Sequence, residues 1–182
     1  MSRLQLIAHP AQAVPRVDSL EVVLTRSVDE SLVAVFACSC PVGALLVPKA
    51  RAAEAKDELW RHTCCELFLG SSRDTAYREF NFSPSGEWTS YVFSDYRIGD
   101  SSAMQVSAPR ITFIFGDAGW RLEARLDKSS LPPFPVEQII LGVAVVLEAR
   151  TGELSYWALQ HGAAQPDFHR RDSFVLQLSD VE

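Results

Sequence analysis

The 182-residue sequence lacks any apolar run long enough to cross a membrane. The longest such run, IILGVAVVL, covers only Ile139–Leu147, whereas a membrane-spanning helix needs about 20 apolar residues. The N-terminal stretch reaches His9 and Pro10 after only a few apolar residues, so it does not have the apolar region of a secretory signal. We therefore expect a soluble, cytoplasmic protein with no membrane partner.

Positive charge is also scarce. The chain has 17 Lys and Arg residues against 23 Asp and Glu residues, which gives a net charge of -6. A nucleic-acid-binding domain would instead show a basic patch or stripe. The composition therefore argues against a nucleic-acid partner.

The cysteines do not form a recognisable metal motif. Cys38 and Cys40 are two apart, Cys64 and Cys65 are adjacent, and no C-x-x-C pair is present. Zinc sites have a characteristic spacing that these residues do not match. We expect reduced thiols that pack as small buried hydrophobic side chains.

Common catalytic motifs are missing as well. There is no G-x-S-x-G nucleophile elbow, and the nine glycines are scattered and form no phosphate-binding loop. Glu66 and Glu79 could act as a glycosidase-like carboxylate pair only if they converge in one cleft. We therefore do not expect an enzyme.

The sequence is rich in residue patterns with a period of two, which are typical of β-strands. In residues 120–127, for example, Trp120, Leu122, Ala124 and Leu126 alternate with charged residues. Similar patterns predict strands at 20–26, 31–40, 64–70, 103–108, 110–117, 139–149, 153–159 and 173–179, and on both sides of an SPSG turn.

Many short strands separated by turn signals indicate an all-β protein. We predict a two-sheet antiparallel β-sandwich, of jelly-roll or immunoglobulin-like type, as a single domain over residues 1–182. At most one or two short helices are expected. Residues 48–62 form either one short helix or a long exposed loop, and residues 127–134 form one helical turn that ends at Pro132 and Pro133.

The segment YREFNFSPSGEWTSYVFSDYR (77–97) predicts a hairpin that combines many aromatic residues with Glu79 and Asn81. An even-numbered loop would place Phe80 and Phe82 on one face with Tyr91 and Phe93. The other face would then carry Glu79, Asn81 and Trp88. A three-residue loop would instead place Trp88 with the phenylalanines. Because the first arrangement makes one face largely apolar, we expect it.

That second face suits a sugar-like ligand, because aromatic rings stack on a pyranose and carboxylate or amide groups bind its hydroxyls. Trp60 precedes a strand that carries Glu66, and Trp157 lies in another strand. Arg97, at the end of the hairpin segment, could close such a site. We therefore list the ligand-binding candidates as Trp60, Glu66, Glu79, Asn81, Trp88, Arg97 and Trp157.

A second group of polar residues lies in the loop before the last predicted strand. His161 and His169 could bind a metal together with Asp167. Their spacing matches no standard metal motif, so we keep both histidines only as weak metal candidates. The alternative is a loop held in place by hydrogen bonds.

Four segments together resemble the DOMON-like proteins related to family 9 carbohydrate-binding modules. They are ELWRHTCCELFL, YREFNFSPSGEWTSYVFSDYR, LSYWALQH and PDFHRRDSF, and they extend from about Glu58 to Leu178. The chain looks like the small, stand-alone bacterial members of this group. The resemblance implies a β-sandwich with a ligand site on or between its sheets.

In the sugar-binding members of that family, the ligand lies between tryptophans, and a tryptophan followed six residues later by glutamate belongs to the pattern. Trp60 and Glu66 match this part of the pattern, and Trp157 is a candidate second platform. In the haem-binding members, methionine and histidine ligate iron. Met1 and Met104 are the only methionines here, and Met104 lies in no recognisable ligand motif, so no cofactor is expected.

The sequence therefore predicts a non-catalytic domain that binds a carbohydrate or a sugar-like metabolite. Two other classes stay open. One is haem or metal binding through His161 or His169, and the other is a module that docks a protein partner through its aromatic face. The sequence leaves the oligomeric state open.

Overall fold

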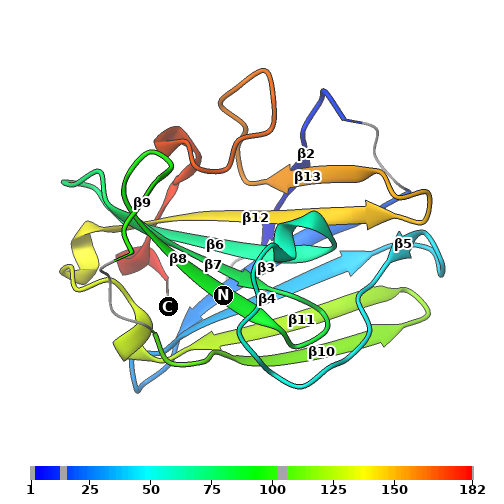
Figure 1. Cartoon of the computed structure of the whole chain (residues 1–182), viewed down its shortest axis with the longest axis horizontal. Helices are drawn as coiled ribbons and strands as arrows, with labels where there is room; N and C mark the ends of the chain where they lie inside the picture. The colour runs from blue at the N-terminus through cyan, green and yellow to red at the C-terminus, as the bar shows by residue number, and fades with distance from the viewer. Residues whose placement is uncertain (1–2, 13–15, 102–105, 182) are drawn as a thin grey trace.

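The fold is described from a computed structural model, which covers residues 3–12, 16–101 and 106–181 (Figure 1). Both methionines, Met1 and Met104, lie outside these residues. So does the first half of the strand expected at 103–108, and residues 106–108 are not in a strand. Within the described ranges, no helix is long and apolar enough to span a membrane.

The smaller of two sheets has five strands. In spatial order they are β1 (Leu4–Gln5), β3 (Ser19–Arg26), β4 (Leu32–Ser39), β11 (Gly119–Leu126) and β10 (Arg110–Gly116). All neighbours pair antiparallel. In β3, β4 and β11, buried and less buried residues alternate, so one face of this sheet packs inward and the other meets solvent.

The larger sheet contains the other nine strands. In spatial order they are β2 (Ile7–Ala8), β13 (Leu154–Ala158), β12 (Ile139–Ala149), β6 (Cys64–Ser71), β7 (Tyr77–Phe82), β8 (Trp88–Asp95) and β9 (Ile98–Gly99), while β5 (Leu45–Leu46) and β14 (Leu176–Gln177) also pair with β12. These strand pairs are antiparallel as well. The predicted two-sheet antiparallel β-sandwich is therefore confirmed.

The main core lies between the two sheets. Side chains such as Phe36 and Leu122 from the smaller sheet form one buried cluster with Leu67, Phe80 and Phe82 from the larger sheet. All five are fully buried. The interior is thus built from alternate residues of both sheets, as packing of two amphipathic sheets requires.

The centre of the larger sheet is covered on its outer face too. Every residue of β6 is buried, and nearly every residue of β12 is, as expected for a strand of continuous apolar sequence. A second cluster on this outer face joins Phe68, Tyr77 and Phe174, with Phe168 packed against it. The chain after β13, coloured orange to red in Figure 1, supplies Phe168 and Phe174.

Helical structure in the described residues is limited to five 3₁₀ turns of three residues each. They are η1 (Leu59–Arg61), η2 (Lys128–Ser130), η3 (Val136–Gln138), η4 (Arg171–Ser173) and η5 (Leu178–Asp180). The segment 48–62 is therefore a loop that ends in a single turn. All four cysteines are free and buried, as the sequence predicts.

The register of the β7–β8 hairpin corrects the sequence-based expectation. Phe82 pairs with Trp88, which leaves a five-residue loop between the strands. An odd-numbered loop reverses the parity of the second strand. Phe80 and Phe82 point into the core as expected, but Tyr91 and Phe93 lie on the opposite face, together with Glu79.

Candidate ligand-binding site

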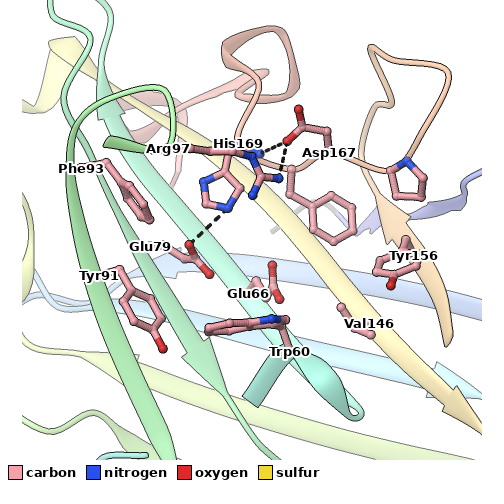
Figure 2. Close-up of a pocket in the computed structure, with 12 residues that line it drawn as sticks. Trp60, Glu66, Glu79, Tyr91, Phe93, Arg97, Val146, Tyr156, Asp167 and His169 are labelled. Carbon is pink, nitrogen blue, oxygen red and sulfur yellow. Dashed lines mark hydrogen bonds and ion pairs between the residues drawn. The ribbon is translucent and has the colours of Figure 1, made fainter. Parts of the chain in front are cut away.

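A cavity of about 340 Å³ lies on the outer face of the larger sheet. Small-molecule sites in proteins typically measure roughly 300–1,000 Å³. The residues around it come from η1, from β6, β7, β8, β12 and β13, and from the loops at 96–97 and 159–170: Trp60, Glu66, Glu79, Tyr91, Phe93, Arg97, Val146, Tyr156, Pro166, Asp167, Phe168 and His169. Polar and aromatic groups therefore converge on one space (Figure 2).

Two carboxylic acids form part of the floor. Glu66 of β6 pairs with Asn81, and Glu79 of β7 pairs with Phe68, so the two glutamates occupy diagonal positions on one face of the sheet. Such neighbours are roughly 7–8 Å apart at their backbones. Glu66 and Glu79 are 2% and 5% exposed, and Figure 2 shows both between Trp60 and the Arg97–Asp167 pair.

Glu79 is held by its neighbours. The Asn81 side-chain amide donates a hydrogen bond of 2.6 Å to Oε1 of Glu79, and Cys64 Sγ lies 3.5 Å from Oδ1 of the same asparagine. On its other side, Oε2 of Glu79 lies 3.7 Å from Nε2 of His169. The amide of Asn81 therefore fixes the orientation of Glu79 from within the sheet.

Glu66 differs, because no hydrogen bond to its carboxyl group is present among the described residues. Burial raises the pKa of Glu66 well above its usual range, and the nearby Glu79 carboxylate adds to the rise. Burial also raises the pKa of Glu79 to about 7, although the Asn81 hydrogen bond and Arg97 oppose this shift. The pair therefore retains a proton near neutral pH.

Arg97 stands at the rim, in the tight turn between β8 and β9. Its guanidinium lies 2.9 Å from the carboxylate of Asp167, which also accepts a hydrogen bond of 2.6 Å from the Tyr96 hydroxyl. Arg97 has a φ of 55°, a left-handed conformation that is costly for a residue with a side chain. Its backbone N–H donates to the Tyr77 hydroxyl at 3.1 Å.

The Tyr77 hydroxyl also forms a hydrogen bond with the ring of His169. Because the Tyr77 oxygen accepts from Arg97, its own hydrogen is free to donate to Nδ1 of His169, 2.8 Å away. When the Tyr77 hydroxyl donates to Nδ1, the hydrogen of the neutral ring lies on Nε2, which faces Glu79. Burial, helped by Arg97, lowers the pKa of His169 to about 4, so the ring is neutral at physiological pH.

Aromatic side chains make the walls. Trp60 is 38% exposed and contacts Tyr91 edge to face, with ring centroids 5.6 Å apart. Glu58, which precedes this turn, has a φ of 60°. Tyr156 and Phe168 lie across the cavity, with ring centroids 6.0 Å apart. An accessible indole at the mouth can stack on a flat apolar ligand surface.

The structure therefore brings together Trp60, Glu66, Glu79 and Arg97, four of the seven predicted site residues. Asn81 is fully buried beneath them and reaches the cavity only through Glu79.

The two other predicted tryptophans lie elsewhere, which corrects their expected placement. Trp88 has the parity of Phe82, on the opposite face of the sheet from Glu79. Trp157 is 7% exposed and belongs to the core between the sheets, where its indole N–H donates to Ser155 at 3.0 Å. Neither tryptophan lines the cavity.

The two candidate metal ligands have different partners. His169 lines the cavity, but Nε2 of His161 hydrogen-bonds to the Ile7 carbonyl at 2.9 Å and its ring contacts His9. Among the described residues, no group of three or more His, Cys, Asp or Glu side chains is placed to hold a metal. These contacts do not fit a haem or metal centre shared by both histidines.

Sequence reasoning missed several cavity residues, chiefly Tyr91, Phe93, Tyr156 and Phe168. For Tyr156 the sequence gives only part of the answer: Tyr156 and Trp157 are adjacent on a strand, so they must face opposite sides, but the pattern does not show which of them faces outward. For Tyr91 and Phe93, only the loop length, and hence the register, could have decided the face.

One solved structure is clearly similar in fold. It is a protein from Bacteroides uniformis ATCC 8492, provisionally assigned to carbohydrate binding, with a TM-score of 0.64 and 14% identity, and the match covers 96% of this chain and 84% of that one. At this identity, the likeness shows a shared fold.

Two structures of family 9 carbohydrate-binding modules from Caldicellulosiruptor kristjanssonii also match. The one in complex with glucose has a TM-score of 0.49 and 14% identity and covers 80% of this chain and 72% of that one. The one in complex with cellotriose has a TM-score of 0.48 and 11% identity and covers 87% and 72%. No family model matches the sequence, and no curated protein does either.

Proposed function

We propose that this chain is a non-catalytic domain that binds a carbohydrate or sugar-like metabolite in the outer-face cavity. The observation that carries the proposal is the convergence of an accessible indole, Trp60, with two buried carboxylic acids, Glu66 and Glu79. Aromatic rings stack on the apolar face of a pyranose, and carboxyl groups accept hydrogen bonds from its hydroxyls. The shared fold with the Bacteroides protein, which is provisionally assigned to carbohydrate binding, supports the same reading.

We also propose a relationship to the DOMON-like proteins and family 9 carbohydrate-binding modules. Its support is the order of the sequence motifs, with Trp60 six residues before Glu66.

The converging polar groups favour a small ligand over a protein partner, since an interaction module would present a broad apolar patch instead. The cavity is bounded on several sides and has buried hydrogen-bonding groups in its floor. Small-molecule sites have this combination of an apolar lining and a few polar groups.

Hydrolysis is a weaker alternative. Glu66 and Glu79 do share one face and one cavity, so their directions do not exclude a carboxylate pair. Glycoside hydrolysis, however, needs the two carboxyl groups to flank the scissile bond. Here both come from neighbouring strands of one floor, and a ligand above the sheet would meet them on the same side.

A panel of mono- and oligosaccharides tests the proposal, with binding measured by calorimetry for the wild type and for Trp60→Ala. We expect at least one sugar to bind, and Trp60→Ala to weaken it at least tenfold. Trp88→Phe is a matched control, because this tryptophan has the opposite parity, and it should bind as the wild type does. Equal binding by Trp60→Ala, or no binding by any sugar at millimolar concentration, would contradict the proposal. Release of new reducing ends from the bound sugar would show hydrolysis instead.

A further inference from the structure

Acidic side chains outnumber basic ones in the described lining of the cavity. Glu66, Glu79 and Asp167 are acidic, and Arg97 is the basic lining residue. Its guanidinium is already bound to Asp167 at the rim. His169 contributes no positive charge, because its ring is neutral and bonded to Tyr77. Among the described lining residues, the two glutamates therefore have only Arg97 as a nearby cation, and Arg97 is already paired with Asp167.

Glu66 is the clearest sign of a missing partner. Glu66 is only 2% exposed, and its side chain lines the cavity. Its carboxyl group has no hydrogen bond to another described residue. Buried carboxyl groups in folded proteins are almost always hydrogen-bonded or paired with a charge. The Glu66 carboxyl group lines the cavity and is therefore placed to accept a hydrogen bond from a ligand there.

Because Glu79 lies diagonally to Glu66, a ligand group that meets one of these carboxyl groups can also meet the other. A neutral hydroxyl group donates one hydrogen bond, whereas a protonated amine donates three and carries a positive charge. A single ammonium group above the floor can therefore satisfy both carboxylates, and charge-assisted bonds of this kind are about twice as strong as neutral ones.

The aromatic side chains that line the cavity also suit an ammonium group. Trp60, Tyr91, Phe93, Tyr156 and Phe168 all line the cavity, and the faces of aromatic rings attract cations within about 6 Å. A negatively charged ligand would meet the two carboxyl groups and the negative ring faces, and the one basic side chain of the described lining, Arg97, is already paired with Asp167. The lining therefore selects against uronic acids and sugar phosphates.

We infer that the ligand carries a protonated primary amine, so that the cavity binds an amino sugar in preference to the corresponding neutral sugar. The amine is held between Glu66 and Glu79, and the sugar ring lies against Trp60. This inference rests on the proposed function, because it names the class of sugar that the same cavity takes.

This arrangement predicts that binding of the amine releases a proton from the glutamate pair. The free protein keeps a proton on the glutamate pair near neutral pH, and an ammonium group favours both ionised forms, so binding releases a proton. The ionisable groups that surround the pair come from every neighbouring element: Cys64, Cys65, Tyr77, Tyr91, Arg97, Tyr156, Asp167 and His169. The thiols of Cys64 and Cys65 and the phenols of Tyr77 and Tyr91 stay protonated in this range, because burial raises their pKa values.

Matched pairs of sugars test the inference. Calorimetry at pH 6.5 would compare glucosamine with glucose, galactosamine with galactose and mannosamine with mannose, in two buffers with different enthalpies of ionisation. The N-acetyl derivatives keep the nitrogen but remove its charge. We expect one amino sugar to bind at least tenfold more tightly than both its neutral and its N-acetyl counterparts, with proton release. Glu66→Gln should lower this preference to within about threefold.

The outcomes separate the two proposals. If a neutral sugar binds as tightly as its amine, in a manner that Trp60→Ala abolishes, the inference fails and the proposed function stands. If a non-sugar amine such as cyclohexylamine binds as tightly as any amino sugar, the site is a cation site and the proposed function fails. If no compound binds, both proposals fail.

Discussion

The two faces of the larger sheet are built from the same strands but have opposite chemistry. In β7, Phe80 and Phe82 point inward and are fully buried against the smaller sheet. Their neighbours Glu79 and Asn81 point outward. Glu79 lines the cavity, and the Asn81 amide donates a hydrogen bond to Glu79. The inner face is an apolar core, whereas the outer face buries carboxyl groups. Alternate residues of one strand therefore contribute separately to the core and to the proposed ligand site, and single substitutions can tell the two apart.

The inner face should show the largest loss of stability. Phe80→Ala removes a fully buried ring from the main core, and such truncations cost about 3–5 kcal/mol. The free energy of unfolding from urea denaturation measures this. Trp60→Ala, on the outer face, provides the comparison, and an equal loss from both variants would remove the distinction between the faces.

The outer face should make stability depend on pH. Glu66 and Glu79 have pKa values raised above those of the unfolded chain, so their contribution is complete at low pH and is lost as pH rises through the folded values. His169 acts oppositely: its pKa is lowered to about 4, so it costs stability only as pH falls below about 6.5.

We therefore expect the free energy of unfolding to fall as the pH rises from 6.5 to 8. Glu66→Gln should flatten this slope, because it removes one of the two carboxylates and relieves the other. Urea denaturation at several pH values measures it. A wild-type stability that does not change over this range would show that the pair is already ionised in the folded protein.

Asn81 lies between the two regions and should show an intermediate effect. Asn81→Ala removes the amide that donates to Glu79 and the acceptor next to Cys64, and an unsatisfied buried group costs about 1–3 kcal/mol. Binding should weaken too, since Glu79 loses its fixed orientation. If stability falls but sugar affinity does not, Asn81 has no positioning role.

Trp60 should give the smallest change in stability and one of the largest in binding. Its ring is 38% exposed, and surface truncations usually change stability by less than about 0.5 kcal/mol. Thermal denaturation and calorimetry on the same Trp60→Ala sample test both parts. A large loss of stability would mean that the indole packs as a core residue.

Much of the fold could be predicted from the sequence, because period-two patterns such as WRLEARLD show which side chains share a face. The site was predictable only in part. Trp60, Glu66, Glu79 and Arg97 meet in the cavity, but the parity of β8 depends on the length of one loop.

An ambiguous loop length explains the misplacement of Trp88 and the omission of Tyr91 and Phe93. The SPSG turn signal does not show that the loop has five residues. For Trp157, the neighbouring Tyr156 is also aromatic, and the pattern does not determine which of the two faces outward. The loop residues Asp167 and Phe168 reach the cavity through tertiary packing, which has no local sequence pattern.

The four tryptophans of the chain offer the most direct test of the account. Their indole N–H signals can be followed by ¹⁵N NMR while glucosamine, and in a separate sample glucose, is added to millimolar concentration. If the outer face binds the sugar, the signal of Trp60 shifts with saturation, while those of Trp88, Trp120 and Trp157 stay in place. Saturable shifts of Trp88 or Trp157 with Trp60 unchanged would contradict the account.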